Sequence, residues 1–172
     1  LSLDDLDSIA VSKGPGSYTG LRIGVSTAKG LCFSLNIPLI SIATLASLAA
    51  QVKLKRGFVI PMLDARRMEV YSTVFDENLK EIRETKAEVL DENSFADYLG
   101  KDKTVFIGSG VEKFKAICTH SNAEFILDKL PSAREMCSLA EAKYKISDTE
   151  DVAYFEPFYL KDFIATIPRK LI

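Results

Sequence analysis

The chain has 172 residues, with 22 Lys and Arg against 24 Asp and Glu and a formal net charge of -2. This near balance gives no global electrostatic attraction to nucleic acid, whose binders usually carry a basic face. The single histidine excludes a metal site that needs two histidines of one chain, such as HExxH. Three cysteines without a CxxC pair indicate a reducing compartment, so we expect a cytoplasmic protein.

The first third of the chain has the pattern of an α/β unit. Residues 7–12 predict a short strand, and a glycine-rich turn then leads into a helix at 21–35. A strand at 38–42 and a helix at 44–53 follow. This order indicates a mostly parallel sheet. Because the chain starts at Leu1 in what reads as a turn, we expect it to begin inside a domain.

The composition changes near residues 53–57, where β-branched and aromatic residues become frequent, and this change predicts a domain boundary. Strands and helices then alternate, which again indicates an α/β arrangement. The predicted strands lie at 58–64, 69–75, 81–89, 104–107 and 124–127, and the predicted helices at 94–99, 111–119 and 132–144.

Residues 30–52 carry no charge and are numerous enough to span a bilayer. Pro38 interrupts this stretch, because proline ends a helix at the preceding residue. Polar side chains such as Ser41 and Gln51 are scattered through it. We therefore expect buried elements here and no membrane partner.

The glycine-rich turn is a candidate phosphate loop through Gly14, Gly16 and Ser17. Its spacing fits neither the Walker pattern nor GxGxxG, and Pro15 removes a backbone N–H donor. Ser17 and Thr19 can still cap a helix N-terminus, which attracts anions. A tight strand-to-helix turn is the competing interpretation.

The helix after this turn is apolar on most sides. Gly20, Gly24 and Ala28 form a stripe of small residues, and a second stripe of apolar residues runs beside it. Such a helix is either wholly buried or shared with a partner. The pattern alone leaves both alternatives open.

The densest charged cluster near a strand end reads DARRME. Its carboxylates, Asp64 and Glu69, suit acid–base catalysis or a divalent cation. Pairing of these acids with Arg66 and Arg67 in a hairpin turn is the favoured interpretation. His120 follows a predicted helix in a polar turn, and no GxSxG elbow supports a serine triad.

Several stretches are similar, in order and spacing, to the motifs of one family. Residues 13–24 read KGPGSYTGLRIG, which resembles the GPGS[FY]TG[LV]RIG signature of the bacterial TsaB (YeaZ) family. Residues 64–66 and 69–71 are similar to its DAR and EVY motifs, and residues 108–110 to its glycine pair. Residues 157–161, PFYLK, resemble its closing P-x-YLR, with lysine in place of arginine.

This resemblance implies an α/β ASKHA fold, the fold of actin, Hsp70 and sugar kinases, built from two RNase H-like domains. Residues 1–54 would form the remainder of the first domain, residues 55–152 the second, and residues 153–172 a C-terminal segment that returns to the first. The first domain would be N-terminally incomplete, because family members begin with a hairpin that carries a D-T-[AS]-T phosphate motif, followed by a helix.

The resemblance also implies where the sites lie. In that family the helix after the glycine loop helps to build a dimer surface. The partner interface would comprise Thr19, Leu21, Arg22, Val25, Ala28, Lys29, Leu31, Cys32 and Leu35. A phosphate site would comprise Gly14, Gly16, Ser17, Gly108 and Gly110, and no catalytic or metal-binding residue is implied.

The function implied is that of a non-catalytic scaffold. It would dimerise with TsaD, the catalytic paralogue, and activate it for making threonylcarbamoyladenosine at position 37 of tRNA. In TsaD an HxxxH pair holds the metal. A TsaE-like ATPase is a further expected partner, tRNA an indirect one, and the isolated chain is expected to form a homodimer. ATP or ADP is expected only in the assembled complex. The alternative function is that of an ASKHA phosphotransferase or ATPase that works through the glycine loops and Asp64. Older names of the wider family imply a metallopeptidase, and a chain with one histidine does not support that activity.

Overall fold

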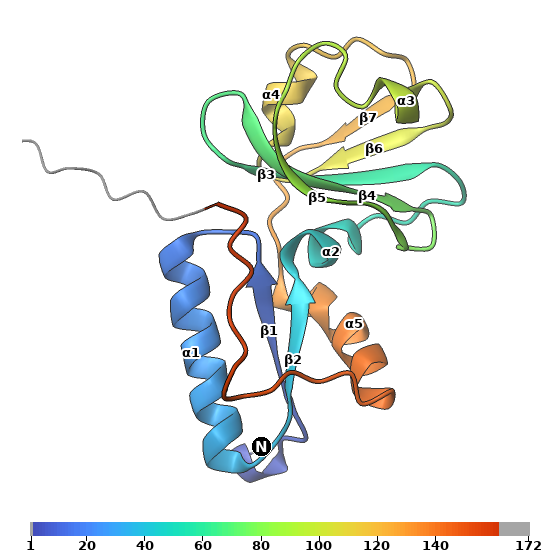
Figure 1. Cartoon of the computed structure of the whole chain (residues 1–172). Helices are drawn as coiled ribbons and strands as arrows, with labels where there is room; N and C mark the ends of the chain where they lie inside the picture. The colour runs from blue at the N-terminus through green and yellow to red at the C-terminus, as the bar shows by residue number, and fades with distance from the viewer. Residues whose placement is uncertain (1, 162–172) are drawn as a thin grey trace, which may run out of the picture.

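A computed structural model describes residues 2–161 of the chain, which form two sheets with helices around them (Figure 1). The first sheet has two strands, β1 (Ile9–Gly14) and β2 (Leu39–Ala43). The second has five strands in the order β5-β4-β3-β6-β7. A short 3-10 helix, η1 (Leu3–Asp5), precedes β1.

The first sheet is parallel, with Ile9 opposite Leu39 and Ser12 opposite Ile42. The long helix α1 (Tyr18–Leu35) connects its two strands, as the predicted α/β unit requires. A two-stranded sheet is only marginally stable alone. Here α1, α2 (Thr44–Ala49) and α5 (Ala133–Lys145) pack against its strands.

The second sheet begins with an antiparallel meander of β3 (Phe58–Asp64), β4 (Glu69–Asp76) and β5 (Glu81–Val89). Two parallel strands, β6 (Thr104–Ile107) and β7 (Ala123–Ile126), extend it beyond β3. The short helices α3 (Ala96–Leu99) and α4 (Val111–Lys115) connect the later strands.

The core of this second part is rich in aromatic side chains. Phe106 and Phe114 are fully buried, with ring centroids 4.8 Å apart in an edge-to-face arrangement. Phe95 packs edge-to-face on both of these rings, and Phe125 stacks on Phe106 at 5.5 Å. Such contacts add to the area that the rings bury, so this cluster fixes α4 against the sheet.

Helix α2 lies where the two sheets meet, and α5 lies beside the first sheet. All side chains of α2 except Ala46 are buried, and the helix packs against β1, β2 and β3. Helix α5 packs against β2 and α2 (Figure 1). The division of the chain into 1–54, 55–152 and 153–172 stays a prediction, and these contacts favour grouping α5 with the first segment.

After α5 the chain runs back along α1 as an extended segment, residues 150–161, which we call the strap (Figure 1). The strap begins at an isolated bridge, where the Glu150 N–H donates to the Leu39 carbonyl over 2.8 Å. Farther on, the Phe158 N–H donates to the Lys13 carbonyl over 2.7 Å. It ends at Lys161, whose ammonium pairs with Glu69 on β4. The strap therefore joins β2, α1, the end of β1 and the second sheet.

Candidate functional site

Helix α1 has an inner face that packs within the chain. The helix begins at Tyr18 because the Ser17 hydroxyl accepts a hydrogen bond from the Gly20 N–H, and it ends at Asn36, which has the left-handed conformation common at helix C-termini. Its buried residues are Leu21, Val25, Ala28 and Cys32. The last two belong to a core cluster with Leu39, against which Ile9, Val11 and Phe155 pack.

The residues predicted as a partner interface divide between this inner face and the rest of the helix. Leu21, Val25, Ala28 and Cys32 are buried in the chain itself, so a partner does not reach them in this structure. Leu31, Leu35 and Lys29 are half-buried, and Thr19 and Arg22 are exposed. The predicted apolar stripe is therefore the inner face of α1, and the interface at these residues stays a prediction.

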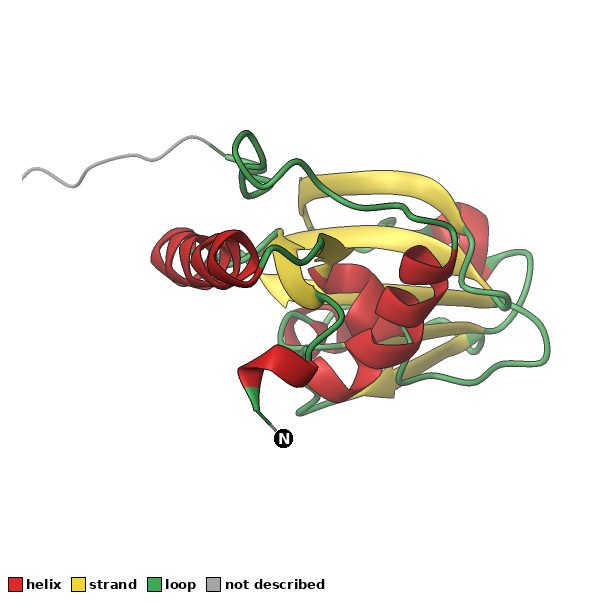
Figure 2. Cartoon of the chain, turned by 90° about the horizontal axis from the view of Figure 1, so that it is seen from below, coloured by secondary structure: helices red, strands yellow, loops and turns green. Residues whose placement is uncertain are grey.

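The opposite side of α1 is the outer face, which we define as Ile23, Thr27, Gly30, Phe33 and Ser34. Ile23 is 62% exposed and Phe33 82% exposed, although both are large and apolar. The other three are small and also exposed. Figure 2 shows α1 nearly end-on at the periphery of the molecule. The outer face has no charged side chain, which is unusual for an exposed helix surface.

Burial also determines the chemistry of Cys32. Its side chain is 1% exposed, and the thiol donates a weak hydrogen bond to the Pro38 carbonyl over 3.6 Å. Burial raises the pKa of the Cys32 thiol, although a hydrogen bond with the backbone of Ile9 opposes this change. A thiol with a raised pKa is a poor nucleophile, so Cys32 acts as a packed apolar residue.

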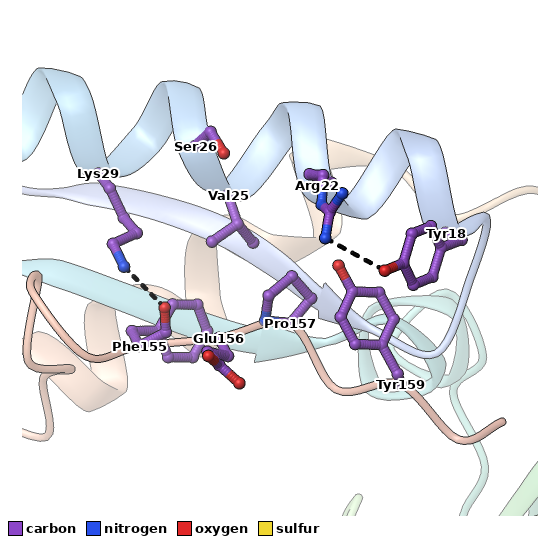
Figure 3. Close-up of a pocket in the computed structure, with 9 residues that line it drawn as sticks. All are labelled: Tyr18, Arg22, Val25, Ser26, Lys29, Phe155, Glu156, Pro157 and Tyr159. Atoms are coloured by element: carbon purple, nitrogen blue, oxygen red, sulfur yellow. Dashed lines mark hydrogen bonds between the residues drawn. The ribbon is translucent and has the colours of Figure 1, made fainter. Parts of the chain in front are cut away.

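A groove lies between α1 and the strap, with a cavity of about 410 Å³ (Figure 3). From α1, Arg22 and Lys29 line it together with Val25. The Lys29 ammonium donates to the carbonyl oxygens of Ala153 and Phe155, over 3.0 and 2.9 Å. These bonds hold the strap beside the helix.

The glycine-rich turn at the start of α1 supports the strap. Gly14 has φ 115°, and a Cβ atom there would lie 2.5 Å from the carbonyl oxygen of Phe158. Next to this close approach, the Tyr18 ring stacks on Tyr159 with centroids 4.5 Å apart. Only glycine combines this φ with this approach, so Gly14 is explained by packing.

The second glycine pair, at 108–110, also serves packing. A Cβ atom at Gly108 would overlap the Met62 carbonyl oxygen, and one at Gly110 would lie 2.8 Å from Val70. A second cavity of about 340 Å³ is lined by Gly16 and Ser17 but by neither glycine of this pair. The structure therefore does not bring the two predicted halves of a phosphate site to one cavity, and that site stays a prediction.

The acids of the charged cluster are paired, but not with the arginines expected. The Asp64 carboxylate accepts from the Arg66 N–H over 2.7 Å and pairs with the Lys113 ammonium over 3.0 Å. The backbone bond from Arg66, with Lys113 in support, lowers the pKa of Asp64 despite partial desolvation. Glu69 pairs with Lys161 of the strap. Both acids therefore have local structural partners.

The remaining candidate groups are dispersed. His120 is exposed, and its Nδ1 accepts a hydrogen bond from the Asn122 N–H over 3.1 Å. Within residues 2–161, no three side chains of His, Cys, Asp or Glu gather in a way that would hold a metal ion. None of the helices in the same range has the length and apolar character needed to cross a membrane.

Two solved structures from Pseudomonas aeruginosa are similar to this chain. One, described as YeaZ, has a TM-score of 0.76 and 26% identity and aligns over 93% of this chain and 76% of its own. The other is described as an uncharacterized protein with similarity to peptidase YEAZ. It has a TM-score of 0.77 and 25% identity and aligns over 94% of this chain and 76% of its own. The sequence model of the family described as TsaD, tRNA N6-adenosine threonylcarbamoyltransferase, matches residues 1–169. These findings define an α/β protein with the ASKHA-type fold, as predicted.

Relatives in the sequence comparison narrow this class. Proteins named tRNA threonylcarbamoyladenosine biosynthesis protein TsaB are 32% identical in Haemophilus influenzae and 31% identical in Escherichia coli, over 94% and 95% of this chain. These alignments span 73% and 74% of the relatives. A Bacillus subtilis protein of the same name is 49% identical over 41% of this chain but only 31% of its own length. The chain belongs to the TsaB (YeaZ) family, as its motifs predicted.

Proposed function

We propose that this chain is a non-catalytic subunit in the biosynthesis of threonylcarbamoyladenosine on tRNA, and that it docks on a TsaD-type catalytic paralogue through the outer face of α1. The names of the relatives support the pathway. The exposure of Ile23 and Phe33 supports the docking surface and is the observation that carries the proposal. In this proposal the chain lends a surface and the paralogue supplies the chemistry.

The outer face suits a helix of a partner. Ile23, Thr27, Gly30 and Ser34 follow one another at intervals of four and three residues, so they lie along one side of α1. Apart from the two neighbouring residues and the backbone of α1 itself, no atom lies within 4 Å of the place where a Cβ of Gly30 would stand. Small residues between two apolar ones let a second helix approach closely and cover both.

The chemistry of the other candidate groups supports the same proposal. The Asp64 carboxylate is held by Arg66 and Lys113, and the His120 ring by the backbone of Asn122, so the groups that could act as bases already have structural partners. A general base must lie within hydrogen-bond reach of the group that it deprotonates. These contacts support a structural role for both residues.

The same face accounts for the other partners that we expect. In the absence of the paralogue, two copies of the chain would cover each other's outer faces and form a homodimer. The TsaE-like ATPase and tRNA would then contact the assembly chiefly through the paralogue, and ATP or ADP would bind there. These assignments belong to the proposal.

Calorimetric titration of the TsaD-type protein of the same organism tests the proposal. Ile23→Asp places a charge at the N-terminal end of the outer face and should weaken binding about tenfold or more, because the carboxylate would be desolvated. Ile82→Asp is the matched control, since Ile82 is 43% exposed on β5, away from α1. Equal affinities of the two variants and the unchanged chain would contradict docking through α1.

The alternative, a nucleotide-dependent phosphotransferase or ATPase, has one supporting observation, the cavity beside Gly16 and Ser17 at the N-terminus of α1. ATP turnover by the chain alone, lost in Asp64→Asn, would favour it. We expect neither turnover nor a shift of the unfolding temperature with ATP, because packing explains Gly14, Gly108 and Gly110.

A further inference from the structure

The groove between α1 and the strap contains two cations that no acid within residues 2–161 neutralises. Arg22 and Lys29 both line it, and neither has a carboxylate within 4.0 Å among residues 2–161. Glu156 also lines the groove, but Figure 3 shows its carboxylate directed away from α1. The groove is therefore electrically positive along its helical wall.

The contacts of these two side chains orient the charges without cancelling them. The Lys29 ammonium donates to two neutral carbonyl oxygens of the strap. The Arg22 guanidinium lies 5.1 Å from the centre of the Tyr18 ring and donates to its hydroxyl over 3.1 Å. Carbonyl and hydroxyl partners hold a cation in place but leave its net charge available to an anion. The arrangement is therefore preorganised for negative groups.

The position of the groove relative to the outer face indicates the source of those groups. Helix α1 has two cations and no acid, and both cations lie on the flank beside the strap, next to the charge-free outer face. A helix that covers the outer face would pass along this flank. Arg22 and Lys29 are seven residues apart, which is two turns or about 10.5 Å along the axis.

We propose that the partner helix docked on the outer face places acidic side chains in this groove, one at Arg22 and a second, two turns away, at Lys29. This inference rests on the proposed docking through α1 and adds the charge of the partner surface to it. Charges at the rim of an interface chiefly steer the encounter, so they raise the association rate and make it depend on salt. Acidic residues spaced by about seven positions would then distinguish the right partner helix from others.

The association rate of the TsaD-type partner, measured by stopped flow at about 50 mM and about 500 mM salt, tests this inference. Arg22→Glu should slow association about tenfold at low salt and less than about twofold at high salt, because salt screens the rim charge. Arg22→Lys keeps the charge and should retain most of the low-salt rate. Lys115→Glu is the matched control, since it makes the same charge change at an exposed position on the last turn of α4.

The outcomes separate this inference from the proposed function. If Ile23→Asp abolishes binding but Arg22→Glu changes the rate no more than Lys115→Glu does, the acidic complement is refuted and docking through α1 stands. If neither variant affects binding, both proposals fail. If Arg22→Glu leaves the binary association unchanged and instead weakens tRNA binding by the assembled complex, the two cations contact RNA phosphates, and the inference is overturned.

Discussion

At the scale of single residues, the glycine-rich motif resembles a phosphate loop in sequence, but in the structure its first glycine has a packing role. Gly14 lets the strap pass over the end of β1, because the Phe158 carbonyl oxygen lies 2.5 Å from the place that a Cβ atom would take. The two most distant motifs of the chain, at 13–24 and 157–161, are therefore parts of one contact. This contact explains why glycine is needed at 14 without any ligand.

Gly14→Ala should destabilise the chain by about 1–3 kcal/mol, because alanine combines a strained φ of 115° with a collision against Phe158. Gly30→Ala is the matched control. Gly30 lies inside α1 with open space around it, so alanine there should stabilise by up to about 1 kcal/mol. Urea unfolding of both variants measures the difference, and equal midpoints would contradict the packing role.

The pairing of Asp64 predicts a contribution to stability that depends on pH. The pKa of Asp64 is lower in the folded chain than in the unfolded chain, so the carboxylate stabilises the fold above its unfolded pKa of about 3.9. This stabilisation is lost as the pH falls through the folded pKa. Asp64→Asn should therefore lower stability at pH 6 and lower it less at pH 3.

The size of this effect is limited by solvent. Asp64 is 47% exposed, so the loss at pH 6 should be at most about 1 kcal/mol. Urea unfolding midpoints of both proteins at the two pH values measure it. A difference that stays constant or grows toward pH 3 would mean that the Lys113 and Arg66 contacts do not stabilise the ionised carboxylate.

At the scale of elements, the strap holds α1 against the first sheet. Phe155 packs on the cluster of Ala28, Cys32 and Leu39, and Lys29 binds the strap backbone on both sides of Tyr154. These contacts come from a segment without regular secondary structure. The Phe155 ring and the backbone groups of the strap together attach it to α1 and to the ends of β1 and β2.

Phe155→Ala should release the strap and speed amide hydrogen exchange in α1, because it removes a half-buried ring from that cluster. Its neighbour Tyr154 is 84% exposed and provides the control, since Tyr154→Ala should leave exchange in α1 unchanged. Equal exchange in both variants would show that α1 is held by the sheet alone.

The strands were predictable because their signal is local. Runs of β-branched and aromatic residues predicted β3 at 58–64 and β6 at 104–107, and both have these bounds. Helix bounds were less accurate. Helix α1 begins three residues before the predicted start, since the cap is Ser17, and α2 ends at Ala49 rather than at 53. Local contacts at helix ends decide these limits.

The sequence pattern predicted the inner face of α1 but not the outer face or the contacts with the strap. Apolar spacing identifies the most apolar side of α1, and this side packs inside the chain. The outer face appeared in the sequence only as Ile23 and Phe33, two large apolar residues outside the main stripe. The strap contacts of Lys29 join positions more than 120 residues apart, so no local pattern contains them.

At the scale of the whole molecule, the strap connects the two sheets, and within the described part of the chain it leaves one side of α1 uncovered. It starts at β2, passes α1 and ends at Glu69 on β4. The inner side of α1 is thereby fixed, and the outer face is presented at the periphery (Figure 2). A rigid helix with an exposed charge-free side needs little rearrangement on binding, which favours affinity.

The most direct test of the account is the accessibility of the outer face in the complex. Ser34→Cys, in a background with Cys137→Ser because Cys137 is exposed, provides a thiol for maleimide labelling on α1. Ser138→Cys, on the exposed side of α5, is the control. Saturating TsaD-type partner should slow labelling at Ser34→Cys about tenfold or more and leave the control unchanged. Unchanged labelling at Ser34→Cys in a formed complex would contradict docking through the outer face of α1.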